Sequence, residues 1–79
     1  MNYKDFEQYN GKNLNDFVEV VEKGYLVDVC RIGDVDVKIK YEEDYPSADV
    51  RLMDGTLIGH AVEDNNCNYI FEASDHEWT

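Results

Sequence analysis

The sequence predicts an α+β fold in which one N-terminal helix, at about residues 13–23, packs on an antiparallel, mostly meander sheet of about five strands. Three patterns support this prediction. Apolar residues recur at helical spacing within residues 13–23, apolar and charged residues alternate within residues 34–41, and an Asp-Gly pair at 54–55 separates two apolar runs. With 79 residues, 43% of them hydrophobic, the chain is expected to form one small domain over residues 1–79.

The first eleven residues predict a short helix or an aromatic arm. Tyr3, Phe6 and Tyr9 or Asn10 follow one another at roughly helical spacing, and the pair Asn10-Gly11 is typical of a turn. We expect these aromatic side chains to cover one edge of the core.

The predicted helix at residues 13–23 carries signals at both ends. Asn13 is expected to be the N-cap, because its side chain can accept a hydrogen bond from a backbone amide of the first turn. Gly24 is expected to take the left-handed conformation that ends a helix. An apolar stripe would face the sheet, formed by Leu14, Phe17, Val18 and Val21.

The start of this segment carries a local resemblance. Residues 9–17, YNGKNLNDF, resemble the segment of barstar-like proteins in which Tyr-Gly, a variable residue and Asn-Leu-Asp open a helix. The resemblance implies a helix start here and carries no site residue to this chain.

Two strands are expected between the helix and the centre of the chain. Residues 25–31 predict a strand with Tyr25, Val27 and Val29 on one face. Residues 34–41 predict a half-buried strand, because inward apolar and outward charged side chains alternate. Its inward residues are Val35, Val37, Ile39 and Tyr41, and residues 42–47 follow as a polar loop.

Residues 48–62 predict a central hairpin with a two-residue type I′ turn at Asp54-Gly55. Facing pairs would be Met53–Thr56, Leu52–Leu57, Val50–Gly59 and Ala48–Ala61. Asp49 would face His60 on the outer side of the sheet. Such a pair can orient a general base, but we expect a cross-strand polar contact, and His60→Ala should then change stability little.

The last strand, residues 68–73, has a register that depends on the loop before it. A two-residue loop at 65–66 would place Ile70 on the core face and leave Tyr69 and Phe71 outside, as an apolar patch. A three-residue loop would point Tyr69 and Phe71 inward. We favour the three-residue loop, because these are the largest apolar side chains near that end.

The charge of the chain is unevenly distributed. The net charge is −11; residues 1–40 carry eight acidic and six basic side chains, whereas residues 41–79 carry ten acidic side chains and Arg51 alone. This field disfavours direct binding of nucleic acid or an anionic membrane and favours a basic partner. Without a membrane-spanning or signal-peptide pattern, a cytoplasmic location is expected.

No motif indicates a cofactor, a metal site or an enzyme. Zinc is not expected, because Cys30, His60, Cys67 and His76 lack the spacing of zinc modules. Calcium is not expected, because the acidic clusters do not match the calcium-loop pattern. A disulfide between the two cysteines is not expected in a reducing cytoplasm.

The acidic surface therefore predicts a non-enzymatic inhibitor. It would bind a basic nucleic-acid-handling protein, of the nuclease, CRISPR-effector or restriction type, and block its DNA- or RNA-binding groove by charge mimicry. Small phage-encoded nucleic-acid mimics, including anti-CRISPR and anti-restriction proteins, resemble this chain in size and charge. The expected partner-binding residues are Glu42, Glu43, Asp44, Asp49, Asp54, Glu63 and Asp64, with Tyr45 and Trp78 as apolar anchors.

The alternative is an immunity-type or adaptor module that binds a protein without mimicry. It would use an apolar sheet face containing Ile58 and Val62, and its binding would be insensitive to salt. Both a monomer and a homodimer are compatible with either function.

Overall fold

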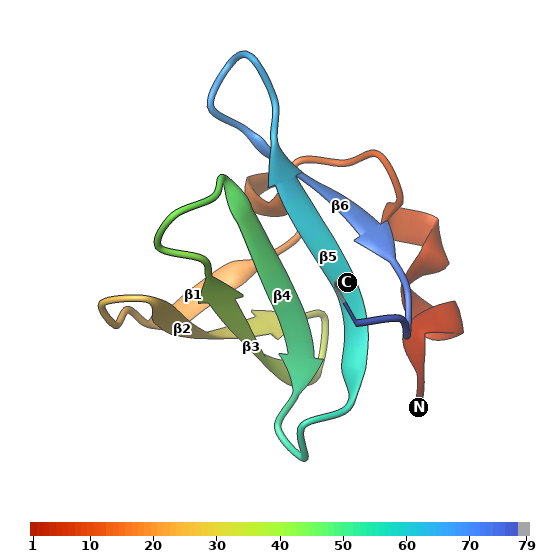
Figure 1. The fold of residues 1–79 in the computed structure, drawn as a ribbon. Helices are drawn as coiled ribbons and strands as arrows, with labels where there is room; N and C mark the ends of the chain where they lie inside the picture. Colours follow the sequence, from red (N-terminus) through yellow and green to blue (C-terminus); the bar gives the residue numbers. More distant parts are fainter. Residues whose placement is uncertain (78–79) are drawn as a thin grey trace.

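The computed structural model describes residues 1–77 and shows a curved, six-stranded antiparallel sheet with two short 3-10 helices in its N-terminal part (Figure 1). The strands follow one another across the sheet in sequence order, so the predicted meander is confirmed. The fold is mostly β, and the predicted α+β class applies only loosely. Neither helix within residues 1–77 is long and apolar enough to cross a membrane. The elements are η1 (Tyr3–Tyr9), η2 (Leu14–Asp16), β1 (Glu19–Glu22), β2 (Val27–Ile32), β3 (Val35–Tyr41), β4 (Ser47–Leu52), β5 (Leu57–Glu63) and β6 (Tyr69–Ala73).

The predicted helix at residues 13–23 is wrong. Asn13 does act as an N-cap, because its Oδ1 accepts the backbone amide of Asn15 at 3.0 Å, but η2 ends after one turn and the chain enters β1. Val20 and Val21 are β-branched and favour extended backbone. Pairing with β2 gives this segment ladder hydrogen bonds, so tertiary structure prevails over an apolar spacing that also fits a helix.

Gly24 has a different role from the one the helix prediction assigned. Its φ is not in the left-handed region, where Gly11, Gly33 and Gly55 lie. A Cβ at Gly24 would collide with the carbonyl oxygen of Val27. The connection from β1 to β2 therefore requires glycine for a close backbone approach.

The face of β2 that carries Val27 and Val29 lies on the outer side of the sheet, away from the core. Val27 is 39% exposed, and Tyr25, just before the strand, is 87% exposed. The register with β3 explains this, because Cys30 lies opposite Val37 and directly opposite residues share a face. The inward residues of β2 are Asp28, Cys30 and Ile32. The predicted inward face of β3 is confirmed, with Val37 and Ile39 almost fully buried.

The β4–β5 turn has three loop residues instead of the predicted two. The Gly55 amide donates to the Leu52 carbonyl at 2.9 Å, and the Leu52 amide donates to the Thr56 carbonyl at 2.8 Å. Gly55 has φ 96°, and Asp54 does not have a positive φ. This is the pattern of a type I turn followed by a glycine bulge.

The register of this hairpin is nevertheless the predicted one over most of its length. Ala48 lies opposite Ala61, Asp49 opposite His60 and Val50 opposite Gly59, whereas Leu57 lies opposite Arg51. The longer turn shifts the register by one residue, and a bulge in β5 restores it. The extra residue is Ile58, and it is fully buried in the core, so its predicted place on the outer face is wrong.

The preferred register of the last strand is confirmed. The Asp64 amide donates to the Asn68 carbonyl at 2.8 Å, which leaves three loop residues at 65–67. Phe71 lies opposite Ala61 and is 1% exposed. Tyr69 packs edge-on against Tyr41, with ring centroids 5.3 Å apart.

The two edges of the sheet differ. At the β6 edge, the Gly11 amide donates to the Phe71 carbonyl and the Phe71 amide donates to the Lys12 carbonyl, both at 2.9 Å. The chain then crosses to β1 at the other edge, where all four residues are exposed. This short strand is bulged and begins and ends with Glu19 and Glu22, features that disfavour pairing with another chain.

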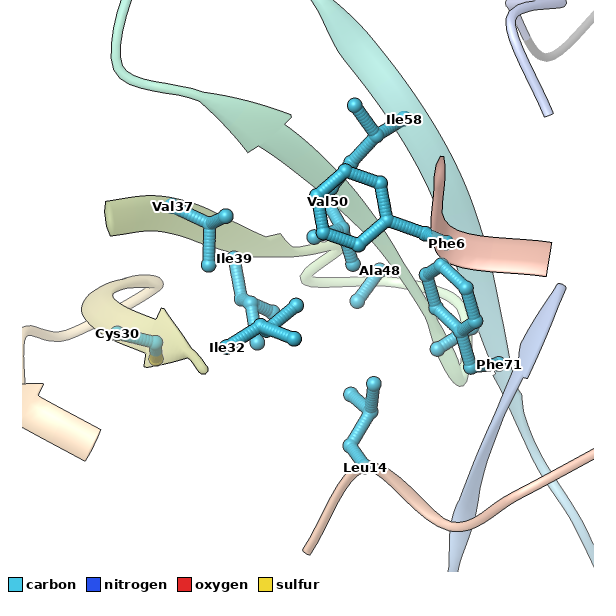
Figure 2. Packing of buried hydrophobic residues seen from close by; sticks show 11 residues of the cluster. Phe6, Leu14, Cys30, Ile32, Val37, Ile39, Ala48, Val50, Ile58 and Phe71 are labelled. Carbon is cyan, nitrogen blue, oxygen red and sulfur yellow. The ribbon is translucent and has the colours of Figure 1, made fainter. Parts of the chain in front are cut away.

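The core lies on the concave side of the sheet and is closed by η1 and η2. Phe6 of η1 and Leu14 of η2 are buried, so the expected aromatic cover from the first segment is confirmed for Phe6. Figure 2 shows the Phe6 ring beside Val50 and Ile58. The buried cluster is Phe6, Leu14, Cys30, Ile32, Val37, Ile39, Ala48, Val50, Ile58, Ala61 and Phe71.

Candidate functional site

Most of the predicted contact residues come together at one end of the sheet. The β3–β4 and β5–β6 loops lie at the same end, the upper one in Figure 1, and the Glu63 amide donates to the Pro46 carbonyl at 2.8 Å between them. We call this surface the acidic end. It consists of Glu42, Glu43, Asp44, Glu63 and Asp64.

The charges of the acidic end are mostly solvent-facing. Its carboxylates are exposed, apart from a half-buried Glu63, and neither residues 41–50 nor residues 62–71 contain a Lys or Arg. Asp64 Oδ1 also accepts the backbone amides of Asn66 and Asn68, at 2.8 and 3.0 Å, which fixes the loop that carries it. Tyr45 lies in the β3–β4 loop and is 71% exposed.

Asp54 lies elsewhere. It is in the β4–β5 turn, at the opposite end of the sheet (Figure 1). The Thr56 amide donates to Asp54 Oδ1 at 2.9 Å and lowers the pKa of this carboxyl. Trp78, the second predicted anchor, lies outside the described residues.

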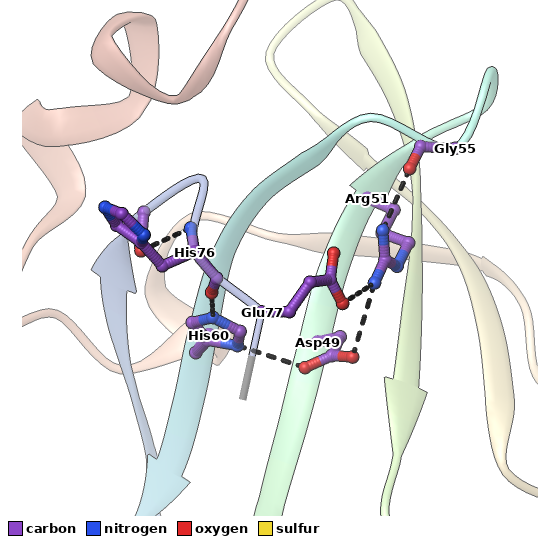
Figure 3. Close-up of polar contacts among 7 residues, drawn as sticks. Asp49, Arg51, Gly55, His60, His76 and Glu77 are labelled. Carbon is purple, nitrogen blue, oxygen red and sulfur yellow. Dashed lines mark hydrogen bonds and ion pairs between the residues drawn. The ribbon is translucent and has the colours of Figure 1, made fainter. Parts of the chain in front are cut away.

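Asp49, which was also predicted as a contact residue, has a largely buried side chain. Asp49 is 9% exposed and His60 is 8% exposed, although both lie on the outer side of the sheet. Asp49 Oδ1 lies 3.0 Å from His60 Nδ1, so the predicted carboxylate–imidazole pair is present (Figure 3). Residues 74–77 cover this pair, a contact between distant segments that strand alternation does not reveal.

The C-terminal segment is held through His60 and Arg51. His60 Nε2 lies against the carbonyl oxygen of His76, and Arg51 bonds to Glu77 Oε1 at 2.6 Å (Figure 3). Arg51 also donates to the Gly55 carbonyl at 3.0 Å. With a carbonyl at Nε2, the imidazole is not placed to take a proton from a substrate, so the pair acts as a structural support.

A buried carboxylate that the sequence analysis missed lies on the core side of β2. Asp28 is 1% exposed, and its oxygens accept the Gly24 amide at 3.2 Å and Lys23 Nζ at 3.3 Å. Burial, followed by the charge of Asp28, raises the pKa of Cys30 to about 11 and that of Tyr41 to about 12. The sequence could have indicated this buried carboxylate only if the face of β2 that carries Asp28, Cys30 and Ile32 had been assigned to the core.

Within residues 1–77, no cluster of three or more His, Cys, Asp or Glu side chains could hold a metal ion. Cys30 is buried and Cys67 is exposed, and both are free thiols.

The outer face of β5 and β6 offers a hollow of about 470 Å³. It is lined by Val62 and Ile70, together with His60 and Glu72. The alternative function was predicted to use an apolar sheet face containing Ile58 and Val62. Because Ile58 lies in the core, the apolar part of this face is smaller than predicted.

A comparison with protein-family models, with curated proteins and with solved structures finds no significant match to this chain.

Proposed function

We propose that this protein is a small acidic inhibitor that binds a basic nucleic-acid-handling protein and blocks its DNA- or RNA-binding groove by charge mimicry. The observation that carries the proposal is the acidic end, where two loops from different hairpins place five carboxylates together without a basic side chain of their own. An anti-defence role against a nuclease, a CRISPR effector or a restriction enzyme is the biological setting we infer.

The physical basis is electrostatic. Carboxylates on two adjacent loops that contain no Lys or Arg complement a groove lined with basic side chains, and the net charge of −11 steers the encounter. Tyr45, exposed within the same loop, supplies a large apolar surface for a desolvated contact.

The test compares two variants of equal net charge. The first, Glu42→Gln/Glu43→Gln/Asp44→Asn, neutralises three of the five carboxylates of the acidic end. The second removes three exposed carboxylates elsewhere, at Glu7, Asp16 and Asp75. Purified nucleases with basic DNA grooves serve as probes, and loss of their DNA binding is measured by fluorescence anisotropy.

We expect the wild type and the second variant to compete with DNA and the first variant to compete at least about tenfold more weakly, since three charge contacts are lost. Competition should weaken as salt is raised from about 50 to about 500 mM, because the Debye length shrinks severalfold. Equal competition by both variants would overturn the proposal. Salt-insensitive binding that is lost on Val62→Glu would instead support the adaptor function.

A further inference from the structure

A cationic groove lies on the outer face of β2, β3 and β4. Its cations are Lys38, Lys40 and Arg51, three of the seven Lys and Arg side chains of a chain with net charge −11. The groove has a volume of about 320 Å³ and an apolar floor that includes Val27 and Met53, which are 39% and 50% exposed. Cations and exposed apolar groups therefore share one concave surface.

The register leaves these cations without full compensation. Lys38 lies directly opposite Arg51, and like charges in that position destabilise a strand pair. Lys40 lies opposite Asp49, whose carboxylate is bonded to His60 and Arg51 instead. Within residues 1–77, no carboxylate lies within 4.0 Å of either lysine ammonium. A like-charged row of this kind is stabilised when an anion binds it.

The third cation already holds a carboxylate from an acidic segment. Glu77 of the C-terminal segment bonds to Arg51 at 2.6 Å (Figure 3). Asp75 precedes it by two residues in the sequence. Lys38 and Lys40 are also two residues apart on one strand face, at a spacing of about 7 Å. An extended peptide with carboxylates at alternate positions has the same repeat.

We propose that the groove binds an extended acidic segment of a partner protein, with carboxylates at alternate positions on Lys38 and Lys40, the first of them shared with Arg51, which lies opposite Lys38. Glu77 competes with this segment for Arg51, so the chain's own C-terminal residues limit its affinity. The local charges decide the attraction, because charges beyond about 8 Å are largely screened at physiological salt.

The probe is a fluorescein-labelled peptide, Glu-Leu-Glu-Leu-Glu, with a matched peptide that has Gln in place of Glu. Binding to the 79-residue chain is followed by fluorescence anisotropy. Lys38→Gln/Lys40→Gln removes two cations that are solvent-exposed and should not affect folding. Lys4→Gln/Lys12→Gln, two exposed lysines outside the groove, is the control of equal charge. Melting temperatures verify that every variant is folded.

We expect the acidic peptide to bind, the Gln peptide to bind at least about tenfold more weakly, and the groove variant to lose about tenfold relative to the control. Glu77→Gln should tighten binding about threefold, because Arg51 becomes available. Equal binding of the two peptides, or equal loss in the groove variant and its control, would overturn the proposal. Unchanged or weaker peptide binding by Glu77→Gln would show that Glu77 does not compete with the peptide for Arg51.

This site is separate from the acidic end, so the two proposals fail independently. The acidic-end variant Glu42→Gln/Glu43→Gln/Asp44→Asn should bind the acidic peptide at least as well as the wild type. Loss of peptide binding in that variant would contradict the assignment to the groove.

Discussion

Cys67 occupies a backbone position that usually belongs to glycine. The β4–β5 and β5–β6 loops have the same hydrogen-bond pattern: the Cys67 amide donates to the Asp64 carbonyl as the Gly55 amide donates to the Leu52 carbonyl. Gly55 has φ 96° and Cys67 has φ 65°. An L-residue is strained in this region because its Cβ crowds the backbone.

Cys67→Gly should therefore stabilise the protein by about 0.5–1 kcal/mol, the relief of strain less the extra entropy of an unfolded glycine. The measurement is urea unfolding followed by circular dichroism. Gly55→Ala, at the equivalent position of the β4–β5 loop, should destabilise the protein. A loss of stability in Cys67→Gly would show that the thiol contributes more than the strain costs.

At His60, burial changes the effect expected from a cross-strand pair. The ring is 8% exposed and bonds to Asp49 and to the His76 carbonyl, so His60→Ala should cost about 1–3 kcal/mol. His76→Ala is the matched control, because the His76 side chain is 93% exposed and only its backbone meets His60. Equal melting temperatures for the two variants would contradict this role.

At the scale of elements, β5 has more buried residues than any other described strand. Its first five residues are all buried, since the core lies on one side and the C-terminal segment contacts His60 on the other. Gly59 lies where the Phe71 ring crosses the strand, and a Cβ there would collide with that ring and lie 2.7 Å from the Glu72 carbonyl oxygen.

Gly59→Ala should accordingly destabilise the fold by about 1–3 kcal/mol through overpacking. Thermal unfolding by calorimetry measures the change. Glu72→Ala, a substitution at an exposed side chain of the paired strand, should have a much smaller effect. An unchanged melting temperature in Gly59→Ala would mean that β5 and β6 can move apart without cost.

At the scale of the whole molecule, two properties set the response to solution conditions: the buried groups beside Asp28 and the net charge. Burial and the Asp28 charge raise the pKa of Cys30 from 9.0 to about 11 and that of Tyr41 from 10.0 to about 12. Both groups are held neutral in the folded state. Their contribution to stability is fully present below pH 9 and is lost as pH rises toward 12.

The urea midpoint should therefore fall between about pH 9 and pH 12. Cys30→Ala/Tyr41→Phe should show a shallower fall than the wild type, although its stability at neutral pH is lower. Tyr25→Phe, at a tyrosine that is 87% exposed, controls for loss of a phenol and should follow the wild-type slope. Parallel slopes for all three proteins would contradict the buried-group explanation.

The net charge of −11 on 79 residues opposes compaction, so added salt should stabilise the protein. The melting temperature should rise as sodium chloride increases from about 10 to about 500 mM. The acidic-end variant, with three fewer charges, should gain less. A fall in melting temperature with salt would indicate that ion pairs such as Arg51–Glu77 outweigh the repulsion.

The sequence by itself determined the features that depend on local alternation and on charge. The inward face of β3, the central register Ala48–Ala61, the inward Phe71 and the antiparallel meander all follow from a period of two and from turn residues. The clustering of the acidic end could also be predicted from the sequence. In an antiparallel meander every second turn lies at the same end of the sheet, and the β3–β4 and β5–β6 loops are two such turns.

Only the tertiary structure decided what residues 18–23 become, which face of β2 is buried, and that Asp49 is covered. Val18 and Val21 fit a helix by spacing, but Val20 and Val21 are β-branched and their segment pairs with β2 instead. Asp28 is buried because the β3 register selects its face, and Asp49 because residues 74–77 return to it. These outcomes depend on contacts between segments distant in the chain, which no local pattern encodes.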